Sequence, residues 1–325
     1  MRYAYIKAIE CYLPPFKLTN QEIERRFPEW PASKIEEKLG IVERSISGAT
    51  EYTSDLAFMA AEKLFSSSLW AKDTIDLLVL CTQTPDFLAP TTACIVQNRL
   101  SLGRTTAAFD INMGCSGFVY GLSVAKAYIE SDQAKTVLLI TADTYSKFIS
   151  PQDKNLVTLF GDGASATLIV AEDNPSTPSL GPFHFHTDGR GAAHLVISGA
   201  GCKITEQHNA RLYMNGPEVF SFSIREVPEA IYAVLAKTGI SLDEIDRFVL
   251  HQANAYILEH IRKKLRIPRE KFVLAMRETG NTVSSSIPIA LKSEIDAGTI
   301  AKGMKVLLVG FGGGYSTAAV IVRLR

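Results

Sequence analysis

Three residues of this 325-residue chain carry side chains that together could do thioester chemistry: Cys115, His251 and Asn281. A cysteine thiolate attacks an acyl carbonyl, and a histidine and an asparagine can donate hydrogen bonds to an oxygen that gains negative charge. Each residue alone has an ordinary explanation, because small buried cysteines, half-buried histidines and turn asparagines are common. Together, each at the end of a predicted element, they indicate one acyl-transfer site.

Cys115 stands where a buried strand is expected to pass into a helix. Apolar and small residues lead up to Gly114, and a helix-compatible run over 118–129 follows the cysteine. A thiol at a helix N-terminus feels the positive end of the backbone dipole and accepts hydrogen bonds from free N–H groups. We therefore expect the pKa of Cys115 to lie below the value of a free cysteine, which is about 8.5.

A glycine-rich segment, 310–314, follows the last long apolar run at 306–309. Such a segment lets backbone come close to a ligand with its N–H groups pointing toward it. It lacks the spacing of a dinucleotide loop, since Tyr315 stands where the third glycine belongs, and it has no Lys-Ser/Thr pair of a phosphate loop. An oxyanion or acyl-thioester role fits it better.

The composition is that of an ordinary globular enzyme, with 46% hydrophobic and 21% charged residues. Lys+Arg and Asp+Glu number 34 each, so no net field argues for a nucleic acid or a membrane as partner. No apolar run reaches the roughly 18 residues of a membrane span, and Lys7 and Glu10 interrupt any signal-peptide pattern. The 5 cysteines are scattered without C-x-x-C spacing, which argues against a disulfide frame or zinc site and favours the reducing cytoplasm.

The chain is predicted to contain two similar halves. Segment 75–80 resembles 245–250, 170 residues later, and segment 136–140 resembles 305–309, 169 residues later. Buried strands that alternate with helix-like stretches predict an α/β fold.

The junction is placed in the polar, proline-bearing loop 171–178, which divides the chain into 1–172 and 173–325. The first half then carries Cys115, and the second carries His251, Asn281 and the glycines. The site is expected between the halves, which is a usual place for a pocket.

Several separate motifs resemble those of the 3-ketoacyl-acyl-carrier-protein synthase III family of the thiolase superfamily. They are Gly114-Cys115-Ser-Gly-Phe, His251-Gln-Ala-Asn254, Gly280-Asn281-Thr, Phe311-Gly-Gly-Gly314, Phe160-Gly-Asp-Gly-Ala164 and Gly40-Ile-Val-Glu-Arg44. The likeness runs from about residue 3 to residue 325. It implies the thiolase-like α/β fold, a duplicated five-layered αβαβα domain that acts as a homodimer.

The resemblance also implies an acyltransferase of fatty acid biosynthesis that catalyses a decarboxylating condensation. Cys115 would take an acyl group from acyl-CoA or an acyl carrier protein (ACP), with the N–H groups of Cys115 and Gly313 as oxyanion hole. His251 and Asn281 would then stabilise the enolate formed when malonyl-ACP loses CO2, and Phe311 would shield the malonyl carboxylate. No tightly bound cofactor is implied.

Three positions depart from the family pattern at the expected donor site. Lys34 stands where the family often has a tryptophan that stacks on the adenine of coenzyme A, and Lys38 and Lys154 stand in place of arginines. Lysine keeps the charge but loses the planar stacking and the bidentate fork. The donor is therefore left open between coenzyme A and a carrier protein.

Two further positions bear on substrate and partner. Ala89 stands where bacterial relatives commonly have a phenylalanine that closes the partner's acyl pocket, so we predict a pocket that accepts more than acetyl. Arg262, Lys263 and Lys264 on a predicted helix, 255–265, match a basic region that holds the carrier, although a solvated helix face is the alternative. Tyr256 replaces a usual arginine, so weak, salt-sensitive docking is expected.

The same residues allow other interpretations. A papain-like protease would have an aromatic residue directly after the nucleophile, whereas Ser116 and Gly117 follow Cys115. Two alternatives keep the fold: acyl transfer to a hydroxyl or amine without decarboxylation, and a non-catalytic carrier-binding scaffold. His184 and His186 could hold a metal, but no third ligand is evident, so no metal is expected.

Overall fold

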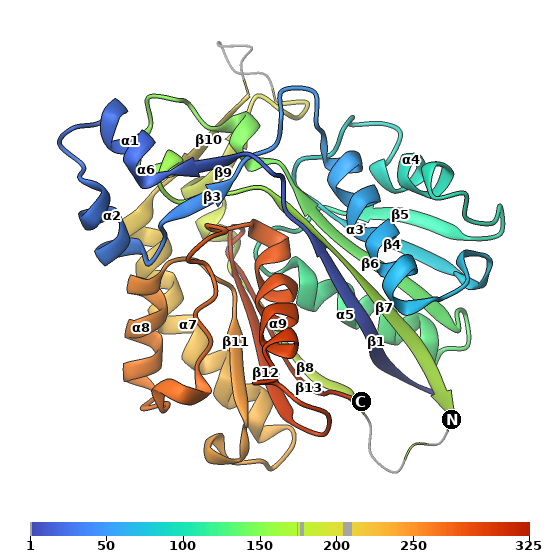
Figure 1. Cartoon of the computed structure of the whole chain (residues 1–325). Coiled ribbons are helices and arrows are strands. Elements are labelled where there is room, and N and C mark those ends of the chain that lie inside the picture. Colours follow the sequence, from blue (N-terminus) through green and yellow to red (C-terminus); the bar gives the residue numbers. More distant parts are fainter. Residues whose placement is uncertain (1, 174, 176–178, 204–209) are drawn as a thin grey trace.

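A five-stranded mixed sheet is built from the first part of the chain, in the order β1-β7-β6-β4-β5 (Figure 1). This computed structural model describes residues 2–173, 175, 179–203 and 210–325. Every residue of β4 and β6 is buried, as expected for strands that are covered on both faces. The strands are β1 (Arg2–Tyr12), β4 (Leu77–Cys81), β5 (Ala107–Ile111), β6 (Thr136–Asp143) and β7 (Gly163–Asp173).

A second sheet repeats this arrangement in the order β11-β12-β13-β8. In both sheets a parallel pair, β4 with β6 and β11 with β12, continues into two antiparallel neighbours. The position that β5 holds in the first sheet is reduced to one parallel bridge between Phe248 and Phe272. The strands are β8 (Leu180–Thr187), β11 (Arg247–Leu250), β12 (Lys305–Gly312) and β13 (Ser316–Arg323).

The strand pairing confirms the predicted repeat. Leu77 pairs with Val137 in the first sheet, and Arg247 pairs with Val306 in the second. The segments that resemble one another in sequence therefore occupy equivalent strands. The division at residues 172 and 173 stays a prediction, and residues 174 and 176–178 of the proposed junction lie outside the described residues.

Helices cover both faces of each sheet and give five layers (Figure 1). Successive strand residues point to opposite faces, so Leu77 and Val79 pack in the middle layer while Leu78 and Leu80 pack in the outer one. The first outer layer holds α3 (Thr53–Ser68) and α4 (Thr92–Arg99), the middle layer α5 (Gly117–Glu130) and α9 (Ser286–Asp296), and the second outer layer α7 (Gly216–Ala236) and α8 (Ala255–Lys264).

The second sheet follows the same alternation. Val306 and Leu308 face the middle layer, whereas Leu307 and Val309 face the outer layer with α7 and α8. The two middle helices, α5 and α9, thus bury apolar faces against both sheets at once. This packing fixes the ends of the two sheets relative to each other.

Shorter elements gather at the upper left of Figure 1, beside the ends of the central strands. They are β2 (Lys17–Thr19), α1 (Asn20–Arg26), α2 (Ala32–Leu39), β3 (Glu43–Ser45), α6 (Lys154–Val157), β9 (Leu195–Ser198) and β10 (Arg211–Met214). Single turns of 3-10 helix occur at Lys72–Thr74, Tyr145–Phe148, Gly189–His194, Leu242–Glu244, Arg269–Lys271 and Val283–Ser285. Within the described ranges, no helix is both long enough and apolar enough to cross a membrane.

Candidate active site

Cys115 lies in the turn between the end of β5 at Ile111 and the start of α5 at Gly117, as its sequence context predicts. Its side chain is buried, and β12 of the second sheet passes directly against it. A Cβ added at Gly312 would lie 2.9 Å from Cys115 Sγ, and one at Gly310 would lie 2.5 Å from the Cα of Ser116. Only glycine permits this close approach, which explains two residues of the glycine-rich segment.

His251 follows β11 directly and is 2% exposed. Its Nδ1 lies 2.6 Å from Ser286 Oγ, which also accepts the backbone N–H of Gln252 at 3.3 Å. With the Ser286 hydroxyl donating to Nδ1, the neutral ring carries its N–H on Nε2. Burial lowers the pKa of His251 to about 3, so the imidazole is neutral at physiological pH.

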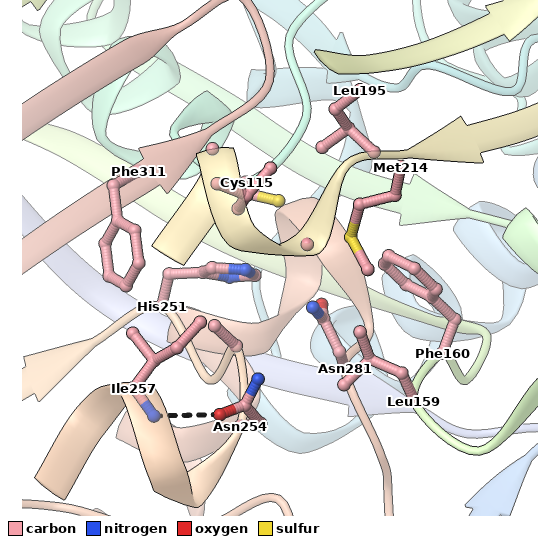
Figure 2. Close-up of a pocket in the computed structure, with 14 residues that line it drawn as sticks. Cys115, Leu159, Phe160, Leu195, Met214, His251, Asn254, Ile257, Asn281 and Phe311 are labelled. Atoms are coloured by element: carbon pink, nitrogen blue, oxygen red, sulfur yellow. Dashed lines mark hydrogen bonds between the residues drawn. The ribbon is translucent and has the colours of Figure 1, made fainter. Parts of the chain in front are cut away.

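Asn281 is held against the first half of the chain by its own backbone. Its N–H donates to the Leu159 carbonyl at 2.9 Å, and its carbonyl accepts the N–H of Gly161 at 3.0 Å. Its side-chain Oδ1 accepts the N–H of Val283 at 3.0 Å. The amide oxygen is thereby occupied, and the Nδ2 donor is left for the cavity (Figure 2).

Val283 adopts a left-handed conformation with φ 53, which is strained for a β-branched residue. The next two residues anchor it, because both the N–H and the hydroxyl of Ser284 donate to Asp143, and Ser285 Oγ donates to the Thr141 carbonyl at 3.0 Å. Strain of this kind costs roughly 1–3 kcal/mol and persists where the surroundings over-determine it. Here the strained residue supplies the N–H that orients Asn281.

One cavity collects the residues predicted to do chemistry. Cys115, His251, Asn281 and Phe311 all line it, and Figure 2 shows the sulfur of Cys115 facing the space between the histidine and the asparagine. The Phe311 ring stands nearly perpendicular to the His251 ring, with centroids 5.4 Å apart. The remaining walls are mainly apolar: Leu159, Phe160, Leu195, Met214, Val219, Ala253 and Ile257.

The expected low pKa of Cys115 is wrong. Burial, and secondly the charge of Asp143, raise the pKa of the Cys115 thiol to about 12, while its own backbone N–H opposes them. The helix N-terminus is present as predicted, but the sulfur lies in an enclosed apolar cavity where a charge loses its hydration. Cys115 therefore rests as a thiol, and the nearness of Asp143 to it is evident only from the structure.

Asp143 is fully buried at the end of β6 and accepts hydrogen bonds from the Gln83 N–H as well as from Ser284. Burial raises its pKa to about 7 despite these donors. Asp162, from the Phe160-Gly-Asp-Gly motif, is a second buried carboxylate, bound by Ser47 and Ser146. That motif therefore holds the segments of Ser47 and Ser146 in place beside the site.

The predicted donor-binding residues lie outside the cavity. Lys34 and Lys38 place their ammonium groups 4.7 and 5.2 Å from the ring centroid of Trp30, and Lys154 pairs with Glu29 at 3.1 Å. An aromatic ring is thus present near the expected position, supplied by a residue that the motif comparison did not single out. Its approach by two lysines fits a cation–π contact.

The predicted docking helix is α8, in which the three basic residues differ in their surroundings. Arg262 pairs with Glu259 at 2.8 Å, and Lys264 Nζ donates to the Ile224 carbonyl at 2.8 Å. Lys263 is exposed and makes no such contact with any described residue. Tyr256 is 55% exposed, and its ring contacts that of His260 on the same helix at a tilt of 54°.

The remaining predicted positions do not line the cavity that holds Cys115. Gly313 packs beside Leu195, one residue beyond the glycine that touches Cys115. Ala89 is exposed, and the apolar Phe87 and Leu88 just before it line a second cavity instead. His186 lies 3.5 Å from Glu226, and no group of three potential metal ligands occurs within the described parts of the chain.

Some residues of the site could not be found from motifs. Gln83 and Asp143 come from two different segments, and each has an unremarkable local sequence. Only the packing of the two sheets brings them to Cys115.

Comparisons with known proteins agree with this architecture. The family models "3-Oxoacyl-[acyl-carrier-protein (ACP)] synthase III" and its C-terminal counterpart match residues 109–189 and 235–324. A beta-ketoacyl-[acyl-carrier-protein] synthase III of Clostridium perfringens is 36% identical over 100% of both chains. A crystal structure of a 3-oxoacyl-(acyl-carrier-protein) synthase III is 46% identical, with a TM-score of 0.96 over 99% of this chain and 100% of that one. The enzyme of this name from Thermus thermophilus is 36% identical, with a TM-score of 0.91 and 99% coverage of both chains.

The duplicated five-layered architecture is the thiolase-like fold, and the chain is a condensing enzyme, an acyltransferase of the ketoacyl synthase class. It belongs to the 3-oxoacyl-acyl-carrier-protein synthase III family.

Proposed function

We propose that Cys115 is the nucleophile of a decarboxylating condensation, and that His251 and Asn281 stabilise the enolate on the way to the new carbon–carbon bond. The observation that carries this assignment is that all three line one cavity together with Phe311. Cys115 and the other two come from the two different sheets. A thiol and two hydrogen-bond donors that face one space can act in turn on one bound substrate.

The first step transfers the acyl group from its donor thioester to Cys115. The sulfur attacks the acyl carbon, the donor's carbon–sulfur bond breaks, and the proton of the Cys115 thiol goes to the departing thiolate. The N–H groups of Cys115 and Gly313 would hold the tetrahedral oxyanion, an interaction whose loss typically costs about 10²–10³ in rate. Burial raises the pKa of the resting thiol to about 12, so the proton leaves together with the acyl transfer in this proposal.

The second step uses a malonyl thioester. Its carboxylate leaves as CO2, and the electron pair forms an enolate whose oxygen accepts hydrogen bonds from His251 Nε2 and Asn281 Nδ2. The enolate carbon attacks the acyl-Cys115 carbonyl and expels the Cys115 thiolate, which takes a proton from water. A neutral His251 suits this role, because it donates without a proton transfer.

Phe311 is proposed to exclude water from the position that the malonyl carboxylate occupies. Its side chain is 1% exposed and packs edge-on against the imidazole. A carboxylate is costly in apolar surroundings, so loss of CO2 relieves that cost. A tightly bound cofactor has no part in these steps.

The substrates are proposed to be acyl-CoA or acyl-ACP as donor and malonyl-ACP as extender. Support for the carrier comes from the relatives, which are named as acyl-carrier-protein synthases. Lys263 on α8 is an exposed cation that an acidic carrier can reach. Lys34, Lys38 and Lys154 are proposed as contacts for the donor's phosphates, a role limited by the pairing of Lys154 with Glu29.

A homodimer is proposed through the free edge of the first sheet. β5 pairs only with β4, so its outer backbone edge faces a second copy of the chain. Phe87 and Leu88 are 60% and 73% exposed, and a partner would bury them. We also propose that the protein is cytoplasmic, since all five cysteines are free thiols. The two halves are proposed to be residues 1–172 and 173–325.

The test combines intact mass with CO2 release. The pure protein is incubated with acyl-CoA and acyl-carrier donors and then with malonyl-ACP. We expect an acyl adduct on Cys115, CO2 release and a 3-oxoacyl product, and no adduct on the Cys115→Ala variant. An adduct that passes to a hydroxyl or amine without CO2 would contradict the condensation. Absence of both adduct and CO2 would overturn the catalytic assignment.

A further inference from the structure

A second, larger cavity of about 530 Å³ adjoins the cavity that holds Cys115. Leu195 lines both cavities, so it forms their common wall. The outer end of the second cavity is apolar and exposed, at Phe87 and Leu88. A space of this size is typical of a small-molecule site, and a shift of the Leu195 side chain would open it to an acyl chain attached to Cys115.

The inner end of this cavity is polar. Gln83 and Tyr145 line it, and the Tyr145 hydroxyl donates to Gln83 Oε1 at 2.5 Å. The Gln83 carboxamide lies against Gly114, because a Cβ added there would be 2.3 Å from Oε1. Gly114 directly precedes Cys115, and adjacent Cα atoms are about 3.8 Å apart, so the carboxamide lies near the thioester end of an acyl chain.

The carboxamide is held in one orientation. Tyr145 is 2% exposed and fixes Oε1, and the backbone N–H of Gln83 donates to Asp143 Oδ1 at 2.9 Å. Gln83 Nε2 has no hydrogen-bond partner among the described residues. An amide donor that is oriented but unpaired beside an acyl site favours an acceptor oxygen on the ligand.

We propose that Gln83 is a specificity residue and that the acyl donor carries an oxygen substituent, a hydroxyl or oxo group, two or three carbons from its thioester. The proposal rests on the proposed function of Cys115. A plain aliphatic acyl chain would displace water from this cavity and leave Gln83 Nε2 without a hydrogen-bond acceptor. A hydroxyl or oxo oxygen at the third carbon would accept that N–H.

The experiment compares butyryl and 3-hydroxybutyryl thioesters of the same small thiol, N-acetylcysteamine, so that the donor's carrier cannot influence the result. The rate of adduct formation on Cys115 is followed by intact mass. One neutral hydrogen bond contributes about 1 kcal/mol, so we expect the 3-hydroxybutyryl adduct to form roughly five- to tenfold faster in the wild type. In Gln83→Leu the preference is expected to vanish or reverse.

Tyr145→Phe is the second variant, since it keeps Gln83 but removes the hydroxyl that orients it. We expect an intermediate preference. The readout is the ratio of two substrates on one variant, so a general loss of folded protein does not imitate it. Equal rates for both thioesters on the wild type, or a Gln83→Leu variant that keeps the wild-type ratio, would overturn the inference while leaving acylation intact. Absence of any adduct would instead overturn the function of Cys115.

Discussion

Ser116 and Ser316 join the two halves of the molecule by a hydrogen bond between their hydroxyl oxygens, 2.7 Å apart and both buried. Ser316 also donates to the Gly313 carbonyl at 3.1 Å, so Ser116 supplies the proton of the shared bond. These two hydrogen bonds connect Ser116, the residue after the nucleophile, to the glycine segment that is proposed to form the oxyanion hole.

We expect Ser316→Ala to slow acylation of Cys115 roughly 5- to 20-fold, less than the 10²–10³ lost with a whole oxyanion donor, because Gly313 would lose its anchor. The buried Ser116 hydroxyl would also lose its partner, at a cost of about 1–3 kcal/mol in stability. Single-turnover adduct formation and thermal unfolding measure the two effects. Ser165→Ala is the matched control, since that buried hydroxyl bonds Thr141 within the first sheet. An unchanged acylation rate in Ser316→Ala would remove this positioning role.

The pH profile of Cys115 alkylation tests two values for the pKa of this thiol. The sequence predicts a pKa below that of a free cysteine, whereas burial in the structure raises it to about 12. Alkylation by iodoacetamide follows the thiolate fraction, which rises about tenfold per pH unit below the pKa. With a pKa of about 12, the rate should still climb between pH 7 and pH 10. A plateau near pH 8 would mean that the helix N-terminus outweighs burial after all.

Asp143→Asn extends this experiment, because the charge of Asp143 is the second cause of the raised pKa. Removing it should lower the pKa of Cys115 and speed alkylation several-fold at pH 8. Asp162→Asn is the control, as it removes a buried carboxylate with similar serine partners that does not act on Cys115. If both substitutions speed alkylation equally, the cause would be a general loosening of the fold around Cys115 and not the charge of Asp143.

Much of the fold was predictable. The offsets of 170 and 169 residues located equivalent strands, because a strand buried on both faces is a continuous apolar run that stands out in sequence. Cys115, His251 and Asn281 line one cavity, and the sequence marks each of them because glycine or polar residues surround it next to an apolar segment. The sequence does not reveal burial at the site, so the pKa of Cys115 was mispredicted. Gln83 and Asp143 were missed because their role depends on sheet packing between distant segments.

The wall between the two cavities should control acyl chain length. Leu195→Phe enlarges this wall, so adducts from long acyl donors should fall at least tenfold while acetyl adducts change little, because overpacking of this kind costs about 1–3 kcal/mol. Leu195→Met is the control, since it keeps the volume of the side chain nearly constant. A chain-length series read by intact mass tests this, together with the expectation from Ala89 that the wild type accepts more than acetyl. A wild type that prefers acetyl would contradict both.

Carrier docking should depend on Lys263. Lys263→Glu is expected to weaken binding of the acidic carrier about threefold to tenfold at low salt, with little effect at high salt, because exposed charges are screened. Lys7→Glu reverses an exposed charge on β1 and serves as control. Titration at two salt concentrations measures the difference. If the Lys263→Glu variant binds the carrier as tightly as the wild type does, the carrier docks on another surface.

The most direct test of the account is a single turnover of enzyme already acylated on Cys115. Mixed with malonyl-ACP, it should release one CO2 for each acyl group lost from the cysteine, at the same rate. Asn281→Ala should slow both events together by about 10²–10³ and leave the preceding acylation nearly unchanged. Loss of the acyl group without CO2, or an Asn281→Ala variant impaired mainly in acylation, would contradict a cavity in which one substrate's enolate meets the acyl-cysteine.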